Sequence, residues 1–249
     1  MQPLLAVVVV AASLVALTGC TQPSPEPSGT VTVLADVALT DAFTAAADSF
    51  EQAHPDVRVE LVFDESDALA VRLRDGGPAD LFASADDATM QRAVAAGSAV
   101  DPVVIATDTL QIVVQAGNPA HITGVVDLAD ESRRIALCDP AVPCGAEGET
   151  VIHLAGYQPA PDSLDRDVHS VLARIVDGSA DAGLAWATEV RAAGNALEGI
   201  DVPEAADAPT RYPVALVEGA PNAVAAHAFL EYLLGDGRVA LTDAGFAAP

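Results

Sequence analysis

The 249-residue sequence predicts an α/β fold in which helices cover both faces of a doubly wound, mostly parallel sheet. Strand and helix patterns alternate along residues 31–96, and this order is typical of βαβ units. Hydrophobic residues make up 51% of the chain, which is enough to bury both faces of such a sheet. In a fold of this kind, ligands bind at the carboxyl ends of the strands.

The first part of the chain contains three strand–helix pairs. Apolar or alternating runs predict strands over residues 31–35, 57–63 and 80–84. Apolar side chains at helical spacing predict helices over residues 41–53, 66–75 and 85–96. The turn between residues 63 and 66 leads from a strand straight into a helix, and backbone N–H groups at a helix start form a ready site for an anion.

A second region with the same logic begins at residue 109. We expect strands over residues 109–115, 134–138, 181–187 and 212–217. We expect helices over residues 146–155, 165–178 and 223–234. The chain shows no internal repeat of fixed period, and its five histidines have no spacing typical of a metal site.

The charge of the chain excludes some classes of partner. All eleven basic residues are arginines, and against 36 acids they leave a net charge of -25. Nucleic acid and anionic membrane surfaces would be repelled by such a protein. The charge favours solubility and does not by itself identify a ligand.

The N-terminus has the pattern of an export signal. Residues 1–19 are uncharged and mostly apolar, and they end in Leu-Thr-Gly before Cys20. This ending resembles a bacterial lipobox, in which Cys20 becomes lipidated after cleavage. Residues 20–29 then form a polar, proline-rich tether. We expect a protein held by lipid outside the cytoplasmic membrane, and the alternative is an ordinary signal peptide with a chance cysteine.

Two further cysteines, Cys138 and Cys144, have five residues between them. Outside the cell a disulfide is chemically permitted, and a loop of this length can be closed by one. Two buried free thiols are the alternative.

The order of motifs resembles one known family. The segments VTVLADVALTDAF, LVFDESDALAVRL, GGPADLFASAD, CDPAVPCG and YPVALVEG are similar to those of the molybdate-binding proteins (ModA), the extracytoplasmic receptors of molybdate ABC transporters. The resemblance covers residues 30–246. It implies a two-lobed, periplasmic-binding-protein-like fold of type II with two crossovers between the lobes. Lobe 1 would contain residues 30–108 and 206–249, and lobe 2 residues 109–205.

The resemblance also implies a ligand site. In the family, backbone N–H groups at helix starts and a few hydroxyl groups hold the oxyanion without a positive side chain, as a helix terminus can. The matching positions in this sequence are Ala38, Ser66, Cys144, Val168 and Trp186. Ala38 replaces a serine of the family and Trp186 a tyrosine, so only Ser66 keeps its hydroxyl group. The indole N–H of Trp186 remains a donor.

Four acidic residues stand close to the expected anion site: Asp36, Asp64, Glu65 and Asp67. One carboxylate about 4 Å from a dianion would repel it by roughly 8 kcal/mol at an effective dielectric constant near 20. One interpretation is that the three acids around Ser66 form a solvated turn that caps its own helix. A second is that one carboxylate occupies the anion site, and a third is an oxygen-rich site for a hard cation or a cationic solute.

The sequence therefore predicts a non-enzymatic, monomeric receptor for molybdate or tungstate that needs no cofactor or bound metal ion. Its partners would be an ABC permease and ATPase, and lobe closure around the ligand would be the signal they recognise. One alternative is a relative of the same fold with altered or lost ligand binding. Another is an exported enzyme or redox protein that uses Cys144 with His153 or His169.

Overall fold

The computed structural model of the protein describes residues 26–249. The predicted signal peptide, Cys20 and the first part of the tether lie outside the described residues. Within residues 26–249, no helix combines the length and the apolar character needed to cross a membrane.

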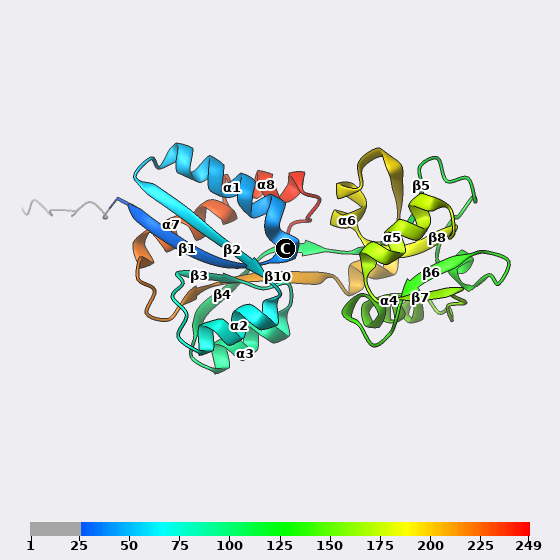
Figure 1. The fold of residues 1–249 in the computed structure, drawn as a ribbon, viewed down its shortest axis with the longest axis horizontal. Helices are drawn as coiled ribbons and strands as arrows, with labels where there is room; N and C mark the ends of the chain where they lie inside the picture. Colours follow the sequence, from blue (N-terminus) through cyan, green and yellow to red (C-terminus); the bar gives the residue numbers. More distant parts are fainter. Residues whose placement is uncertain (1–25) are drawn as a thin grey trace, which may run out of the picture.

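The described chain forms two lobes, each built around its own five-stranded sheet (Figure 1). The sheet of lobe 1 has the strand order β2-β1-β3-β10-β4. Its strands are β1 (Gly29–Asp36), β2 (Val57–Asp64), β3 (Leu81–Ala83), β4 (Ala99–Asp108) and β10 (Thr210–Val217). Strands β1, β2 and β3 are parallel, whereas β10 is antiparallel to both of its neighbours.

Helices cover both faces of this first sheet (Figure 1). Phe43, Phe50 and Phe229 are fully buried between one face and the helices α1 and α7. Leu69 and Met90, from α2 and α3, pack on the other face. The helices are α1 (Thr40–Ala53), α2 (Ser66–Arg74), α3 (Asp87–Ala95), α7 (Ala223–Leu234) and α8 (Arg238–Asp243), and the short 3-10 helix η1 is Val37–Leu39.

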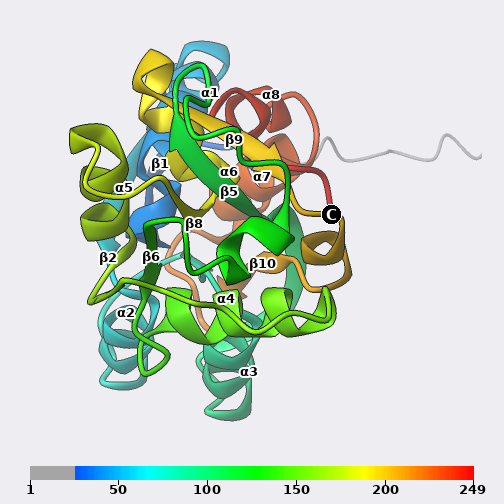
Figure 2. The same ribbon diagram turned by 90° about the vertical axis from the view of Figure 1, so that its right-hand side faces the viewer.

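The sheet of lobe 2 has the strand order β7-β6-β8-β5-β9. Its strands are β5 (Leu110–Gln115), β6 (Ile135–Cys138), β7 (Ser163–Asp165), β8 (Ala182–Trp186) and β9 (Leu197–Asp201). Its helices are α4 (Pro143–Leu154), α5 (Val168–Asp177) and α6 (Ala187–Ala192), with the 3-10 helices η2 (Val125–Ala129), η3 (Gly194–Ala196) and η4 (Pro203–Asp207). Figure 2 shows α4 and α5 on different sides of this sheet, in agreement with its two core clusters.

Two segments connect the lobes. The first leads from the end of β4, Asp108, directly into β5 of lobe 2. The second leads from β9 through η4 back to Thr210 at the start of β10. The predicted α/β class and the two-lobed architecture with two crossovers are confirmed, while the lobe boundaries at residues 108 and 206 stay a prediction.

The structure differs from the sequence prediction in three respects. The largest is β4, a ten-residue strand that the sequence did not indicate. Its first half contains the exposed pair Asp101 and Pro102, so it lacks the clean alternation of a half-buried strand. Both sheets are also mixed, because β10 and β5 run antiparallel to their neighbours. Strands β7 and β9 and helices α6 and α8 are too short to give a clear periodic signal.

Candidate ligand-binding site

The topology brings the carboxyl ends of the parallel strands of both lobes to the side where the lobes meet. Strand β10 begins at a crossover, and because it is antiparallel to β3, its first residues lie beside the carboxyl ends of β3 and β1. In lobe 2, Leu110 at the start of β5 pairs with Trp186 at the end of β8, and β6 is parallel to β8. The loops after β1, β2 and β6 therefore face the region between the lobes, as expected for a ligand site.

In lobe 1, this edge holds two of the positions implied by the resemblance, and we call Ala38 and Ser66 the lobe-1 half-site. Ala38 lies in η1, directly after β1, and it is exposed. Ser66 is the first residue of α2, directly after β2, and it is 6% exposed. The Ser66 hydroxyl group accepts a hydrogen bond from the Ala85 N–H at 2.9 Å.

The carboxylate of Asp36 occupies this half-site. One of its oxygens accepts from the Ala38 N–H at 3.0 Å, and the other accepts from the Ser66 N–H at 2.9 Å and from the Ser66 hydroxyl group. Asp36 is the last residue of β1 and is only 5% exposed. The donors that the resemblance assigns to an oxyanion are thus bound to an acidic side chain of the protein itself.

The three acids around Ser66 are placed differently. Asp64 is exposed and accepts from the N–H of Glu65, its own neighbour, at 2.9 Å. Glu65 is exposed and its side chain does not cap α2. Asp67 pairs with Arg92 and accepts from the Thr89 hydroxyl group at 3.1 Å, so it joins α2 to α3. The structure therefore does not gather these acids into one site.

In residues 26–249, no group of three or more acidic, histidine or cysteine side chains has the geometry to hold a metal ion. The four acids near the half-site therefore do not form the oxygen-rich cation site that was one interpretation of the sequence. Asp36 differs from the other three because it is the one that is buried.

In lobe 2, Cys144 and Val168 form the corresponding pair, and we call them the lobe-2 half-site. Cys144 lies in the first turn of α4, and Val168 is the first residue of α5. The first N–H groups of a helix have no carbonyl partner within the helix, so they remain available to a ligand. Both residues belong to the same buried cluster of lobe 2.

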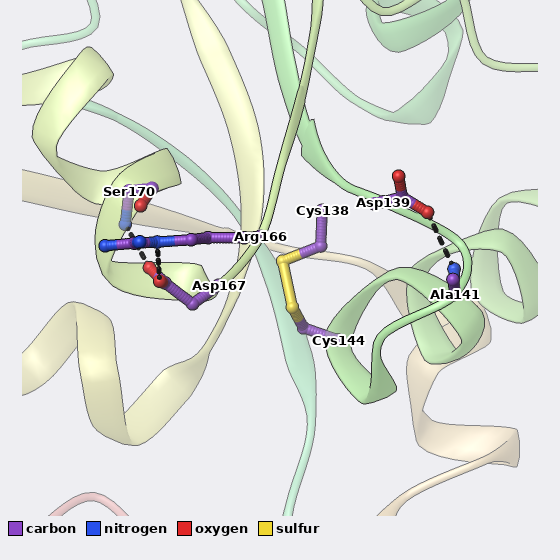
Figure 3. Close-up of a disulfide and its surroundings, with 7 residues drawn as sticks. All are labelled: Cys138, Asp139, Ala141, Cys144, Arg166, Asp167 and Ser170. Atoms are coloured by element: carbon purple, nitrogen blue, oxygen red, sulfur yellow. Dashed lines mark hydrogen bonds and ion pairs between the residues drawn. A yellow bond between two sulfur atoms is a disulfide. The ribbon is translucent and has the colours of Figure 1, made fainter.

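A disulfide between Cys138 and Cys144 fixes the start of α4 (Figure 3). The bond has an S–S distance of 2.07 Å and joins the end of β6 to the first turn of the helix. Figure 3 shows it between the loop with Asp139 and the start of α5 with Asp167. In the oxidised protein the Cys144 sulfur is not a free nucleophile, which leaves the catalytic alternative with the exposed His153 and His169 alone.

Removing this disulfide is expected to cost about 2 kcal/mol of unfolding free energy, because it closes a short loop of the unfolded chain. The test is urea unfolding of a variant with both Cys138 and Cys144 replaced by serine. Reducing agent should shift the wild-type midpoint to that of the variant and leave the variant unchanged. An unchanged wild-type midpoint under full reduction would show that the bond contributes no stability.

Trp186, the fifth implied position, points its donor at the crossover. Its indole N–H donates to the Thr210 hydroxyl group at 3.1 Å, and that hydroxyl group donates to Glu147 of α4. Burial raises the pKa of Glu147, while the hydrogen bonds from Thr210 and Trp186 lower it. The indole N–H therefore supports the junction of the lobes in this structure.

Asp108 lies at the other crossover and is 1% exposed. It accepts from the Thr109 N–H at 2.8 Å and from the hydroxyl group of Thr188, in α6 of lobe 2, at 2.6 Å. Burial raises the pKa of Asp108 to about 6, against the lowering effect of these hydrogen bonds. Asp108, Thr188, Thr210 and Glu147 were not predicted, because their roles depend on crossover contacts that no local pattern reveals.

The region between the lobes is acidic. Burial raises the pKa of Tyr212 in β10 above its usual range, and the nearby carboxylates of Asp108, Asp36 and Glu147 raise it further. A groove of about 730 Å³ opens beside the lobe-1 half-site, and its lining includes Ala38 from lobe 1 and Thr188 from lobe 2. Its lining also includes Arg191, so an anion entering between the lobes would meet this positive side chain as well as the backbone N–H groups.

Comparison with known proteins agrees with this architecture. Residues 31–247 match the family model described as bacterial extracellular solute-binding protein. The molybdate-binding protein ModA of Mycobacterium bovis is 33% identical over 239 residues, which is 93% of this chain and 92% of that protein. ModA of Escherichia coli is 31% identical over 229 residues, or 83% and 84% of the two chains.

Among solved structures, the substrate-binding domain of a putative molybdenum ABC transporter from Clostridium difficile superposes with a TM-score of 0.80. The two chains are 21% identical, and the match covers 88% of this chain and 99% of the other. This likeness shows the fold, and the sequence matches show the family. The chain belongs to the ModA family of bacterial extracellular solute-binding proteins.

Proposed function

We propose that the protein is the solute receptor of an ABC importer and that its ligand is molybdate or tungstate. The observation that carries the proposal is the set of helix starts at Ala38, Ser66, Cys144 and Val168, at the interlobe edge of a ModA-family chain. A tetrahedral oxyanion has several acceptor oxygens, and N–H groups on both lobes can bind it together. Such binding favours the closed arrangement of the lobes.

Backbone donors suit this ligand because they add no net charge and are already in place before binding. Each hydrogen bond to a charged oxyanion contributes about 1.5–3 kcal/mol, and the helix dipole adds a smaller favourable amount. The disulfide at Cys144 and the buried position of Val168 hold their N–H groups in fixed directions. The half-site of lobe 2 therefore needs little rearrangement to receive an anion.

Extracytoplasmic location follows from the family. We propose further that Cys20 carries the lipid that anchors the protein, that the tether spaces it from the membrane, and that the receptor acts as a monomer. The partner is an ABC permease with its ATPase, which recognises the closed, ligand-bound receptor. No step of this function requires catalysis by the receptor or a cofactor.

A second candidate is a receptor of the same fold for a cationic solute. The observation that favours it is the group of carboxylates between the lobes, Asp36, Asp108 and Glu147, around Tyr212. A ligand with ammonium or other donor groups would be attracted there. Such a ligand would not bind to the N–H groups at the starts of α4 and α5. Loss of one of these N–H groups would therefore weaken the binding of an oxyanion but not of a cationic solute.

Calorimetry with molybdate, tungstate, sulfate and Ca²⁺ is the first test. Molybdate or tungstate is expected to bind with micromolar or tighter affinity. Binding of Ca²⁺ or of a cationic solute, with neither oxyanion bound, would contradict the proposal and support the second candidate.

A proline substitution can test the role of a single backbone donor. Proline is tolerated at the first position of a helix and removes the N–H group, and Asp167 before it already has the extended backbone that proline requires. Val168→Pro is expected to weaken oxyanion binding roughly 10- to 100-fold, the value of one charge-assisted hydrogen bond. Val168→Ala, which keeps the N–H group, is the matched control and is expected to retain the affinity within a few-fold.

A further inference from the structure

Asp36 is buried, whereas Asp64 at the end of the neighbouring strand is exposed. Asp36 and Asp64 are the last residues of two adjacent parallel strands and stand opposite each other in register. Asp64 is exposed and bonds only to the next residue, whereas Asp36 is 5% exposed and binds donors of a residue 30 positions away. A carboxylate loses hydration when it is buried, so it remains in such a place only where hydrogen bonds replace the water.

The replacement for water is the lobe-1 half-site itself. The two carboxylate oxygens of Asp36 bind the N–H groups of Ala38 and Ser66 and the Ser66 hydroxyl group. These are backbone and hydroxyl donors at element starts, the same kind that would hold an oxyanion. The Ser66 hydroxyl group has one proton, and it accepts a hydrogen bond from Ala85, so it cannot donate to Asp36 and to a ligand at once.

We propose that Asp36 is an affinity-determining residue of the binding site, whose carboxylate acts as a tethered anion in the lobe-1 half-site. It satisfies the donors of the half-site in the unliganded protein and has to leave them before an oxyanion can bind across both lobes. This inference rests on the proposed function, because it concerns the same site and the same class of ligand. The presence of Asp36 lowers affinity for every oxyanion and leaves the lobe-2 half-site as the place of first contact.

Among the described residues 26–249, none occupies the lobe-2 half-site as Asp36 occupies that of lobe 1. Two acids flank it, but the Asp139 carboxylate accepts from the Ala141 N–H at 2.9 Å, and the Asp167 carboxylate accepts from the Ser170 N–H at 2.7 Å. No hydrogen bond joins a carboxylate to the N–H group of Cys144 or Val168 anywhere in residues 26–249. On lobe 2 an anion therefore does not compete with a carboxylate for these two N–H groups, whereas on lobe 1 it competes with Asp36.

The Asp36 carboxylate is also the N-cap of η1, which is a purely structural role. If Asp36 served only as a cap, its removal would lower the melting temperature and would leave the affinity for the ligand unchanged or weaker. If Asp36 is a tethered anion, its removal should strengthen ligand binding, because three donors become free and one repulsive charge is removed. Molybdate affinity is thus a measurement that separates the two roles.

The test compares Asp36→Ala and Asp36→Asn with wild type by calorimetry with molybdate. The matched control is Asp64→Ala, which removes the same charge from the neighbouring strand end without freeing the half-site. We expect Asp36→Ala to bind molybdate at least about 100-fold more tightly than wild type, and Asp64→Ala to differ by less than about 3-fold. Asp36→Asn keeps the shape and one acceptor, so it should fold even if the alanine variant does not, and it should gain affinity in the same direction.

Thermal unfolding supplies a second readout on the same proteins. Without ligand, Asp36→Ala should melt below wild type because buried donors lose their partner, and molybdate should restore its melting temperature more strongly than it raises that of wild type. If wild type binds molybdate tightly and neither variant gains affinity, the inference is overturned and the proposed function stands. If no variant binds any oxyanion, both are overturned, because freeing the donors has then not produced an anion site.

Discussion

Replacing Gly145 by alanine is expected to destabilise the protein by roughly 3–5 kcal/mol and to abolish oxyanion binding. A Cβ atom at this position would lie 2.0 Å from the carbonyl oxygen of Asp139 and 2.8 Å from that of Cys138. Both clashes are with backbone atoms of the disulfide-closed loop, which has little freedom to move away. The displaced helix start would carry the Cys144 N–H out of the lobe-2 half-site.

Urea unfolding and calorimetry with molybdate measure the two parts of this prediction. Gly148→Ala is the matched control, since Gly148 lies in the same helix and its Cβ atom would meet only the flexible end of Leu184 at 3.3 Å. That variant is expected to stay within about 1 kcal/mol of wild type, helped by the better helix propensity of alanine. Equal stability of Gly145→Ala and wild type would show that the loop can move to make room for the Cβ atom and would contradict the prediction.

Replacing Asp108 by asparagine is expected to stabilise the protein by up to about 3 kcal/mol above pH 7. Burial raises the pKa of Asp108 from 3.8 to about 6 in the folded protein, so its ionised form is disfavoured there. As pH rises from 3.8 towards 6, the unfolded chain loses this proton first and wild-type stability falls. The loss is complete above pH 6, and asparagine avoids it while keeping an acceptor for the Thr109 N–H.

Unfolding free energies of wild type and Asp108→Asn, measured from pH 4 to pH 8, test this prediction. The gain should be largest at pH 7 to 8 and should disappear near pH 4, where both states of wild type hold the proton. Asp181→Asn is the control of opposite sign, because its hydrogen bonds and charge interaction with Arg134 lower the pKa of Asp181. That variant should lose stability at neutral pH, and a gain for Asp108→Asn that does not vary with pH would exclude ionisation as its cause.

Much of the fold could be predicted because its elements carry strong local patterns. The alternation in Val57–Asp64 and the helical spacing in Thr40–Ala53 and Ala223–Leu234 depend only on neighbouring residues. Strand β4 lacks such a pattern, and the antiparallel place of β10 depends on pairing with strands more than a hundred residues earlier in the chain. Two lobes with two crossovers could be expected only through the resemblance to a family.

The positions of the candidate site could be predicted from the sequence, but the directions of its acidic side chains could not. The sequence shows an acid two residues before Ala38 and three acids around Ser66, and any of them could have pointed at the anion site. Side-chain direction at a strand end depends on the turn that follows and on contacts from other segments. Asp67 turns to Arg92, whereas Asp36 turns to the start of a helix 30 residues away. Position along the chain could not distinguish these two cases.

The most direct measurement is a crystal structure of the protein grown with tungstate, with tungsten located by its anomalous scattering. We expect the metal atom between the lobes, with oxygens that accept from the N–H groups of Ser66, Cys144 and Val168, and with the Asp36 carboxylate rotated away from Ser66. Tungstate bound elsewhere would contradict the assignment of this site. Tungstate bound at this site while Asp36 still accepts from Ser66 would contradict the role of Asp36 as a tethered anion.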